Sequence, residues 1–278
     1  DLAGNAISAG ATGQLYTLDN TAPSVVGISR TGAQYTSGGS VSFTVTFDGD
    51  VSGVSAGDFT LSKGNGVVAS DNDITVSGSG SSYTVTVANV SGNGLLGLQL
   101  KSSGTGISDR AGNAISAGFS SGAEYVVDQT SPVVTANQAF TLPENMASGF
   151  VIGQVLASDA NRISGYQITA GDSAGYFSID ADGVITLTAA GAADGAPSRD
   201  YETTPNSFSL TVQATDIAGN THSRVVTISV LNAIEDITPP TASIVVADTA
   251  LSVDETSQVP STLRETVNDF TNADLTVA

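Results

Sequence analysis

The chain has 278 residues, enough for about two domains of ordinary size, and its 27 Asp and Glu outweigh 8 Lys and Arg for a formal net charge of −19. Such a charge repels nucleic acid and anionic lipid and attracts cations, so no nucleic-acid partner is expected. With no Cys, one His and no apolar run near the roughly 18 residues that cross a bilayer, the sequence excludes disulfides and zinc–thiolate sites and argues against membrane insertion.

Short runs of alternating apolar and polar residues indicate an all-β chain. They occur, in chain order, at residues 42–47, 83–87, 208–212 and 226–230. Period-two alternation of β-branched and aromatic residues predicts strands with one buried face. Clusters of Gly, Ser, Asn and Asp separate the runs, and no long stretch has the helical period. The sequence therefore predicts tandem seven-stranded Greek-key β-sandwiches in an elongated array.

Two signatures recur in the same order along the chain. The decapeptide at residues 1–10 returns nearly unchanged at 109–118, with a shorter echo, Asp-Ile-Ala-Gly-Asn, at 216–220. After each comes an Asp followed by Thr two positions later and Pro four positions later, starting at Asp19, Asp128 and Asp236. The spacing is 109 and then 108 residues, which corresponds to one sandwich per period.

The recurring Pro predicts the domain boundaries, because Pro cannot donate a hydrogen bond within a central strand and belongs at a strand's first residue. Complete units are predicted at 23–128 and 129–236. Residues 1–22 are interpreted as the C-terminal remnant of a preceding Ig-like repeat. Residues 237–278 are interpreted as the truncated start of a further Ig-like repeat, so we expect the chain to be part of a longer array.

Five short motifs follow one another in the unit at 129–236. They are Pro143-Glu144-Asn145, Ala157-Ser-Asp159-Ala-Asn161, Phe177-Ser-Ile-Asp180 with Asp182-Gly-Val-Ile185, Asp200-Tyr-Glu202, and Ala214-Thr-Asp216. In this order they resemble the motifs of a cadherin repeat, and the resemblance implies a calcium-binding sandwich. The linker departs from that family, since cadherins carry Asp-x-Asn-Asp-Asn where this chain has Asn232-Ala-Ile-Glu235-Asp236.

The other units carry a different pattern. Two similar stretches occur at 47–54 and 263–270, which read Phe47-Asp-Gly-Asp-Val-Ser-Gly-Val54 and Leu263-Arg-Glu-Thr-Val-Asn-Asp-Phe270. A short segment with one Asp follows each of them, Ala56-Gly-Asp-Phe59 and Asn272-Ala-Asp-Leu275. These stretches resemble the bacterial Ig-like repeats of giant surface adhesins, including those of the repeats-in-toxin type. The resemblance implies an extracellular protein of the bacterial cell surface.

Counting strands through such a sandwich brings the incoming linker, the second–third strand loop and the sixth–seventh strand loop to one pole. In the unit at 129–236 these segments carry Asp128, Asp159 with Asn161, and Asp216. In the preceding unit they carry Asp19, Asp48 and Asp109, and the last unit offers Asp236 and Glu265. At the opposite pole of the cadherin-like unit, Glu144, Asp200 and Glu202 are expected to face Asn232, Glu235 and Asp236. An extended stretch would point Asp200 and Glu202 to one side.

Carboxylates gathered in this way repel one another unless a cation or a proton intervenes. Oxygen ligands without His or Cys favour calcium or magnesium, and the flexible geometry of calcium suits ligands from several loops. The sequence therefore predicts Ca²⁺ as the cofactor. The alternative is that Asp-x-Ala-Gly-Asn is only a tight turn, because Asp, Gly and Asn supply turn geometry.

Three functions were compared on these residues. The first is a calcium-rigidified spacer in a bacterial adhesin, with calcium and the neighbouring repeats as partners and a role in cell adhesion or biofilm formation. The second is an adhesive module that binds a host or surface glycan or protein, or makes homophilic contacts, through the cadherin-like unit. Sugar sites usually use exposed aromatic rings, and aromatic residues are only 6% of this chain. The third is a hydrolase that would use Asp200 and Glu202 as acid and base. No enzyme is expected, because nothing in the sequence supplies a cleft or substrate-binding aromatics and a calcium role already accounts for both residues.

Overall fold

The computed structural model describes residues 2–3, 13–233, 241–244, 250, 252–254 and 261–263. Within these ranges the chain is built of β-strands, with two short 3₁₀ helices, η1 (Ala56–Asp58) and η2 (Asp71–Asp73). No helix among the described residues is long and apolar enough to span a membrane. Contacts divide the chain into two units, Asp1–Leu231 and Asn232–Ala278, which are described separately.

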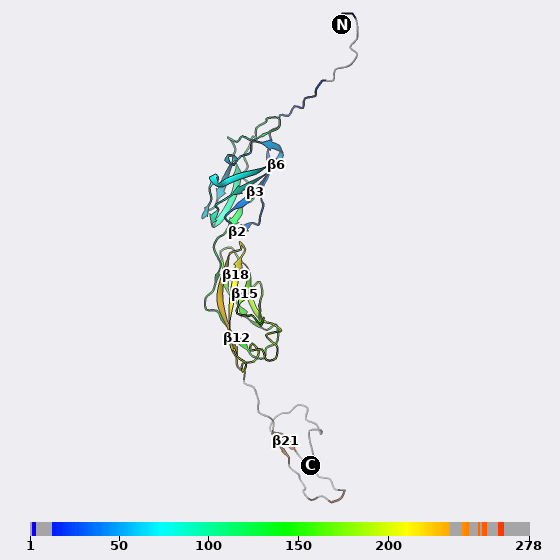
Figure 1. Ribbon diagram of the computed structural model, residues 1–278, viewed down its shortest axis with the longest axis vertical. Coiled ribbons are helices and arrows are strands. Elements are labelled where there is room, and N and C mark those ends of the chain that lie inside the picture. The colour runs from blue at the N-terminus through cyan, green and yellow to red at the C-terminus, as the bar shows by residue number, and fades with distance from the viewer. Residues whose placement is uncertain are drawn as a thin grey trace. The chain divides into compact units, whose positions relative to one another are not determined.

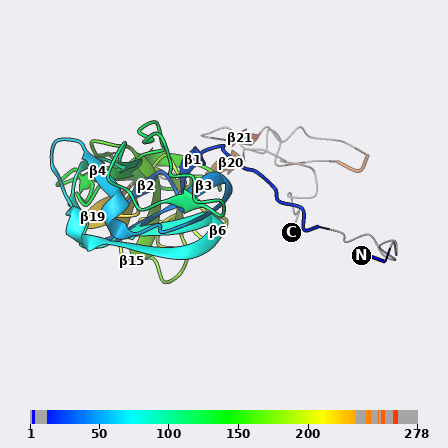
Figure 2. The same ribbon diagram turned by 90° about the horizontal axis from the view of Figure 1, so that it is seen from above.

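The first unit begins its folded part with a sandwich of two sheets (Figure 1). One sheet has the order β1 (Val25–Arg30), β3 (Val41–Ser52), β6 (Ile74–Val87), with β9 (Ser108–Asp109) also pairing with β3. The other has the order β2 (Tyr35–Thr36), β10 (Tyr125–Val127), β8 (Gly94–Leu100), β4 (Phe59–Lys63), and a small pair joins β5 (Val67–Val68) to β7 (Ser91–Gly92). In the view turned by 90°, β1, β3 and β6 lie next to one another (Figure 2).

The alternation along β3 explains how this sandwich is held together. Phe43, Val45 and Phe47 are all buried, while the residues between them are only partly covered. Tyr83 of β6 meets Phe47 edge-to-face with ring centroids 5.9 Å apart, and Tyr125 of β10 meets Phe43 in the same way at 5.2 Å. The two sheets therefore enclose one apolar core, which is the main source of the folding free energy.

A second sandwich follows in the same unit. Its larger sheet has the order β12 (Ala139–Pro143), β19 (Thr221–Leu231), β18 (Ser207–Asp216), β15 (Ile163–Ala170). Its smaller sheet has the order β13 (Val151–Gln154), β17 (Val184–Leu187), β16 (Phe177–Ile179), and β11 (Val133–Val134) pairs with β14 (Ala157–Ser158). Its core is a separate cluster, centred on Leu210, Val212 and Ala214 of β18 and on Val226 and Ile228 of β19.

Most strand pairs are antiparallel, as the sequence predicts, but two are parallel. These are β2 with β10 in the first sandwich and β12 with β19 in the second. In each case a strand near the start of the sandwich pairs with its last strand. In a seven-stranded sandwich that the chain enters at one pole and leaves at the other, the first and last strands run in the same direction. Two strands that run in the same direction can pair only in parallel. These two pairs therefore depart from the antiparallel pairing that the sequence predicts.

The four alternating runs all lie inside strands, so these predictions are confirmed. Residues 42–47 lie in β3, 83–87 in β6, 208–212 in β18 and 226–230 in β19. In the second unit, β20 (Ala242–Ile244) pairs with β21 (Ser261–Leu263) in antiparallel register. The domain boundaries proposed from the recurring Pro stay predictions.

Because the two cores are separate, we predict that a cavity in one sandwich lowers the stability of that sandwich alone. Leu210→Ala removes a side chain with no exposed surface and is expected to cost about 2–5 kcal/mol. Calorimetry in chelator should show one transition shifted down and the other unchanged. Phe43→Ala is the matched variant for the first sandwich, and a shift of both transitions by either variant would contradict independent cores.

Candidate functional site

Three carboxylates meet at the upstream pole of the second sandwich. Asp128 follows β10, Asp159 follows β14, and Asp216 is the last residue of β18. Each offers an oxygen, and these oxygens all lie within 4.8 Å of one another. Asp128 and Asp216 are each only 1% exposed, and Asp159 is half-buried. Residues 88 positions apart in the sequence are thus brought into one acidic group by the strand order.

Amide donors surround this group. The carboxylate of Asp128 accepts two hydrogen bonds. The backbone N–H of Thr130 donates to Oδ1 of Asp128 at 3.1 Å, and Nδ2 of Asn161 donates to Oδ2 of Asp128 at 2.6 Å. The backbone N–H of Asn161 donates to Oδ1 of Asp159 at 2.8 Å. Asn161 therefore lies beside the carboxylates as the sequence predicts, but it presents its amide nitrogen to Asp128, and its oxygen could serve a cation only after the amide turns.

The Asp-Ile-Ala-Gly-Asn turn fixes Asp216. Its Oδ1 accepts hydrogen bonds from the backbone N–H groups of Ala218 and Asn220, both at 2.9 Å, and Nδ2 of Asn220 donates to its Oδ2 at 2.8 Å. The same Nδ2 donates to the backbone oxygen of Asp128 at 2.9 Å. Sequence reasoning treated Asn220 only as a turn residue. Its recurrence as the fifth residue of the repeated motif was the signal that it has a further contact.

The linker is also bound to the first sandwich. The backbone N–H of Gln129 donates to Oδ1 of Asn93 at 2.7 Å, and Nδ2 of Asn93 donates to Oγ1 of Thr130 at 2.6 Å. Oγ of Ser37 donates to the backbone oxygen of Ala218, in the turn of the second sandwich, at 3.0 Å. Thr130 belongs to the recurring Asp-x-Thr-x-Pro signature. The contacts of Asn93 and Ser37 were not expected, because polar residues in turns carry no distinctive pattern.

A second acidic group lies at the opposite pole of the second sandwich. Oxygens of Glu144, Asp200 and Glu202 all lie within 4.8 Å of one another, and Glu144 is 2% exposed. The backbone N–H of Tyr201 donates to Oε2 of Glu144 at 2.9 Å. Asp200 and Glu202 meet through a turn, closed by the N–H of Thr203 on the backbone oxygen of Asp200 at 3.2 Å, and not through the extended stretch considered above. The turn is favoured because Asp200 caps it, accepting from the N–H of Glu202 at 3.0 Å.

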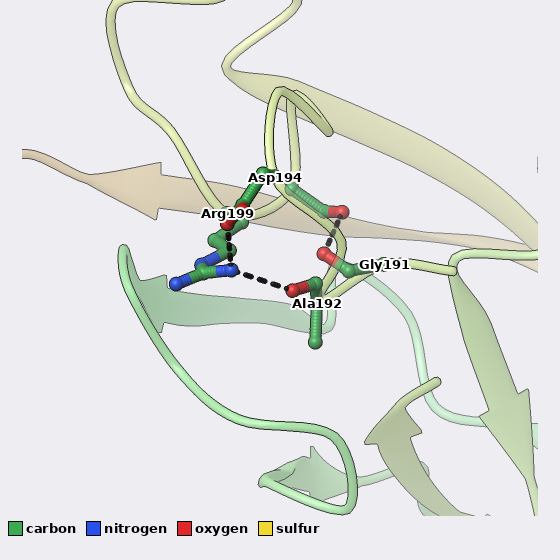
Figure 3. Close-up of polar contacts among 5 residues, drawn as sticks. Gly191, Ala192, Asp194 and Arg199 are labelled. Atoms are coloured by element: carbon green, nitrogen blue, oxygen red, sulfur yellow. Dashed lines mark hydrogen bonds and ion pairs between the residues drawn. The ribbon is translucent and has the colours of Figure 1, made fainter. Parts of the chain in front are cut away.

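The loop between β17 and β18 carries Asp200 and Glu202, and its own polar contacts hold it (Figure 3). The Arg199 guanidinium donates to the backbone oxygen of Ala192 at 3.0 Å and forms an ion pair with Asp194. Oγ of the fully buried Ser198 donates to the backbone oxygen of Gly191 at 2.8 Å. These contacts fix the loop without using a carboxylate of the acidic group.

At the upstream pole of the first sandwich, Asp19, Asp48 and Asp109 line one hollow of about 470 Å³ together with Asp50 and Arg110. In the described part of the chain these carboxylates do not form a group as close as the two above, where all oxygens lie within 4.8 Å. The prediction of a cation here stays a prediction.

Asp48 does not lie on a loop after its strand, as strand counting placed it, but within β3. The register of β3 against β6 shifts between Thr46 and Val51, so residues 48–50 form an exposed bulge in a strand that continues beyond them. Both oxygens of the Asp48 carboxylate accept from Ser24, from its N–H at 2.9 Å and its Oγ at 2.6 Å.

Hydrogen bonds lower the pKa of three of these carboxyls below the ordinary value of 3.8. The Ser24 hydroxyl lowers the pKa of Asp48, the Asn113 amide that of Asp109, and the Thr203 hydroxyl that of Asp200. Each group therefore stays ionised to more acidic pH than a free aspartate, which keeps its oxygens available to a cation.

The remaining predicted ligands are not placed against these groups. Glu235, Asp236 and Glu265 lie outside the described residues. Asn232 belongs to the second unit, and its position opposite Glu144 stays a prediction.

The profile of the bacterial Ig-like domain family matches residues 236–278. No curated protein matches the chain significantly. Solved structures similar to it include protocadherin gamma B2 extracellular cadherin domains 1–5 (18% identity, 78% of this chain, 41% of that chain, TM-score 0.32) and Drosophila N-cadherin domains 1–4 (16%, 77%, 51%, 0.30).

A single-domain structure, the third cadherin domain of human protocadherin 7, is also similar, with 20% identity, 39% of this chain, 92% of that chain and a TM-score of 0.30. The chain spans only 41% and 55% of the first two cadherin structures that it matches. The described part of the chain is an all-β structure of tandem sandwiches. Residues 236–278 match the bacterial Ig-like domain family, and cadherin structures are among those similar to the chain.

We predict that Ser24→Ala raises the pKa of Asp48 toward 3.8, because the hydroxyl that lowers it is lost. A lowered pKa in the folded state stabilises the fold above pH 3.8, and that contribution disappears as the pH falls through the lowered value. Carboxyl-carbon NMR titration measures each group. Thr203→Ala is the control, since it should raise the pKa of Asp200 and leave that of Asp48 unchanged; equal shifts at both sites would contradict these local causes.

Proposed function

We propose that this chain is a calcium-rigidified spacer segment of a bacterial cell-surface adhesin of the repeats-in-toxin type, and that it supports cell adhesion or biofilm formation. One observation supports this proposal above the others. Each pole of the second sandwich gathers three carboxylates whose oxygens lie within 4.8 Å of one another.

The energetics favour a cation at these poles. Two unit charges about 4 Å apart repel by roughly 4 kcal/mol at an effective dielectric constant of about 20. Hydrogen bonds to charged groups are worth about 1.5–3 kcal/mol each, so the amide donors around Asp128 and Asp216 ease the repulsion, but they bring no positive charge to the group. In the described part of the chain no Lys or Arg forms an ion pair with Asp128, Asp159 or Asp216. A divalent ion supplies the missing positive charge.

The donor set points to calcium. It consists of carboxylate oxygens, joined by the Asn161 oxygen once that amide turns, and calcium takes 6–8 oxygens in flexible geometry. We assign Asp128, Asp159, Asp216 and Asn161 to one ion site, and Glu144, Asp200 and Glu202 with Asn232, Glu235 and Asp236 to another. Asp19, Asp48 and Asp109 are proposed for the upstream pole of the first sandwich, with Glu265 in the last repeat. Extracellular modules bind calcium at about 10⁻⁴–10⁻³ M, a range that suits a protein outside the cell.

The proposed ligands come from both sides of the joint, and this explains how an ion would stiffen it. Asp128 belongs to the linker, whereas Asp159 and Asp216 belong to the second sandwich. An ion held by all three removes hinge freedom of the linker, and repetition of such joints turns a flexible string of domains into a spacer. The bacterial Ig-like match at residues 236–278 and the recurrence of the motifs support a repeat array of this kind.

Calcium titration by calorimetry, together with small-angle scattering in calcium and in chelator, tests this function. We predict binding in the range given above and a larger maximum dimension in calcium. Asp216→Asn should weaken binding at its pole by tenfold or more, because it removes one charge from the ion's ligands. Asp182→Asn is the matched control, since this exposed Asp belongs to neither group and its replacement should change nothing. Absence of binding heat, or equal dimensions in both buffers, would refute the proposal.

A further inference from the structure

The Asp-x-Ala-Gly-Asn motif makes a contact that its turn does not require. We infer that its last residue is a positioning residue for the linker aspartate: Asn220 holds Asp128, and Asn113 holds Asp19, before any cation arrives. The consequence for ion affinity rests on the proposed function, whereas the contact itself does not.

The same set of hydrogen bonds is found at both upstream poles. Nδ2 of Asn113 donates to Oδ2 of Asp109 at 2.8 Å and to the backbone oxygen of Asp19 at 3.1 Å. Nδ2 of Asn220 makes the equivalent contacts to Asp216 at 2.8 Å and to the backbone oxygen of Asp128 at 2.9 Å. One amide group thus joins a loop carboxylate to a linker carbonyl, which lies 94 positions before the asparagine in the first case and 92 in the second.

The geometry of the turn is supplied by other residues. Gly112 and Gly219 both have a φ of +92°, in the left-handed region that favours glycine, and nothing packs against the position of their missing Cβ. The aspartate caps the turn by accepting backbone N–H groups. The asparagine side chain is therefore free to reach the linker, and the turn alone does not explain why it is an asparagine.

Chemistry explains the choice. Both atoms that the asparagine contacts, a carboxylate oxygen and a carbonyl oxygen, are acceptors, so the residue between them must donate twice. The NH₂ group of Asn has two hydrogens and does this, whereas Asp of the same shape has no donor and adds a charge beside a carboxylate. The alternative of a turn-only role predicts that Asp is tolerated at this position.

The asparagine holds the backbone carbonyl of the linker aspartate, and a second hydrogen bond holds the carboxylate of the same residue. In both linkers the N–H two residues on donates to the aspartate's Oδ1, from Thr21 to Asp19 at 3.0 Å and from Thr130 to Asp128 at 3.1 Å. With the carbonyl held on one side and the carboxylate on the other, Asp128 has little freedom left. A ligand ordered in advance binds an ion more tightly, because less conformational entropy is lost on binding.

The experiment compares Asn220→Asp with Asn113→Asp in the full chain. Amide hydrogen exchange is first measured in chelator, where no ion contributes. We expect Asn220→Asp to accelerate exchange of the Thr130 amide by roughly tenfold, the effect of one hydrogen bond, while the Leu210 amide in the core is unchanged. Asn113→Asp should leave Thr130 as in the wild type, and Asn220→Ala should act in the same direction as Asn220→Asp.

Calcium titration of the same proteins follows, with an expected three- to tenfold weaker affinity at the second sandwich for Asn220→Asp only. If Thr130 exchanges at the wild-type rate in both Asn220 variants, the positioning role is wrong. If Thr130 and Leu210 accelerate together, Asn220 is merely structural and the inference is equally overturned. If the wild type binds no calcium but Thr130 responds as expected, the proposed function fails and the positioning role stands.

Discussion

Repulsion between carboxylates that share one pole of a sandwich is the constraint on which this structure depends. Asp128 and Asp216 are almost fully buried and lie close to Asp159, an arrangement that hydrogen bonds from neutral amides only partly relieve. Folding alone does not reward such a cluster, since apolar residues of similar size would pack there without electrostatic cost. Under the proposed function this arrangement is one half of an interaction that a cation completes, and the acidic composition and the repeat pattern then share one explanation.

The sandwich supplies the positions, and the linker supplies the connection. Buried alternating residues of β3, β18 and β19 fix the strand register, and a register shift of one residue would turn every core side chain to solvent. The fixed register in turn sets where Asp159 and Asp216 emerge. Each sandwich pairs an early strand with its last strand in parallel, so the chain enters and leaves at opposite poles. The linker at Asp128 therefore meets loops of the second sandwich.

Most of the strands and one acidic group follow from the sequence, and there are physical reasons why the other features could not be predicted from it. Period-two runs located the strands because burial of one sheet face leaves a local pattern. Strand counting brought Asp128, Asp159 and Asp216 to one pole because topology determines which loops are neighbours. The bulge that carries Asp48 was missed because it depends on the pairing with β6 and on bonds to Ser24. The turn at Asp200 uses local bonds to Glu202 and Thr203, and it was missed because the spacing of Asp200 and Glu202 also fits an extended stretch. Asn220 and the Gln129–Asn93 contact join partners far apart in the chain, and such pairs leave no periodicity to detect.

The contacts of the linker have a consequence for how such arrays change during evolution. Asp128 turns its side chain to Asn161 of the second sandwich, and the next residue, Gln129, donates from both its backbone and its side chain to the first. A residue inserted between Asp128 and Gln129 would separate these two sets of contacts, so both could not keep their present geometry. Whole repeats can therefore be duplicated or shuffled without loss of this joint, provided that recombination keeps residues 128–130 together.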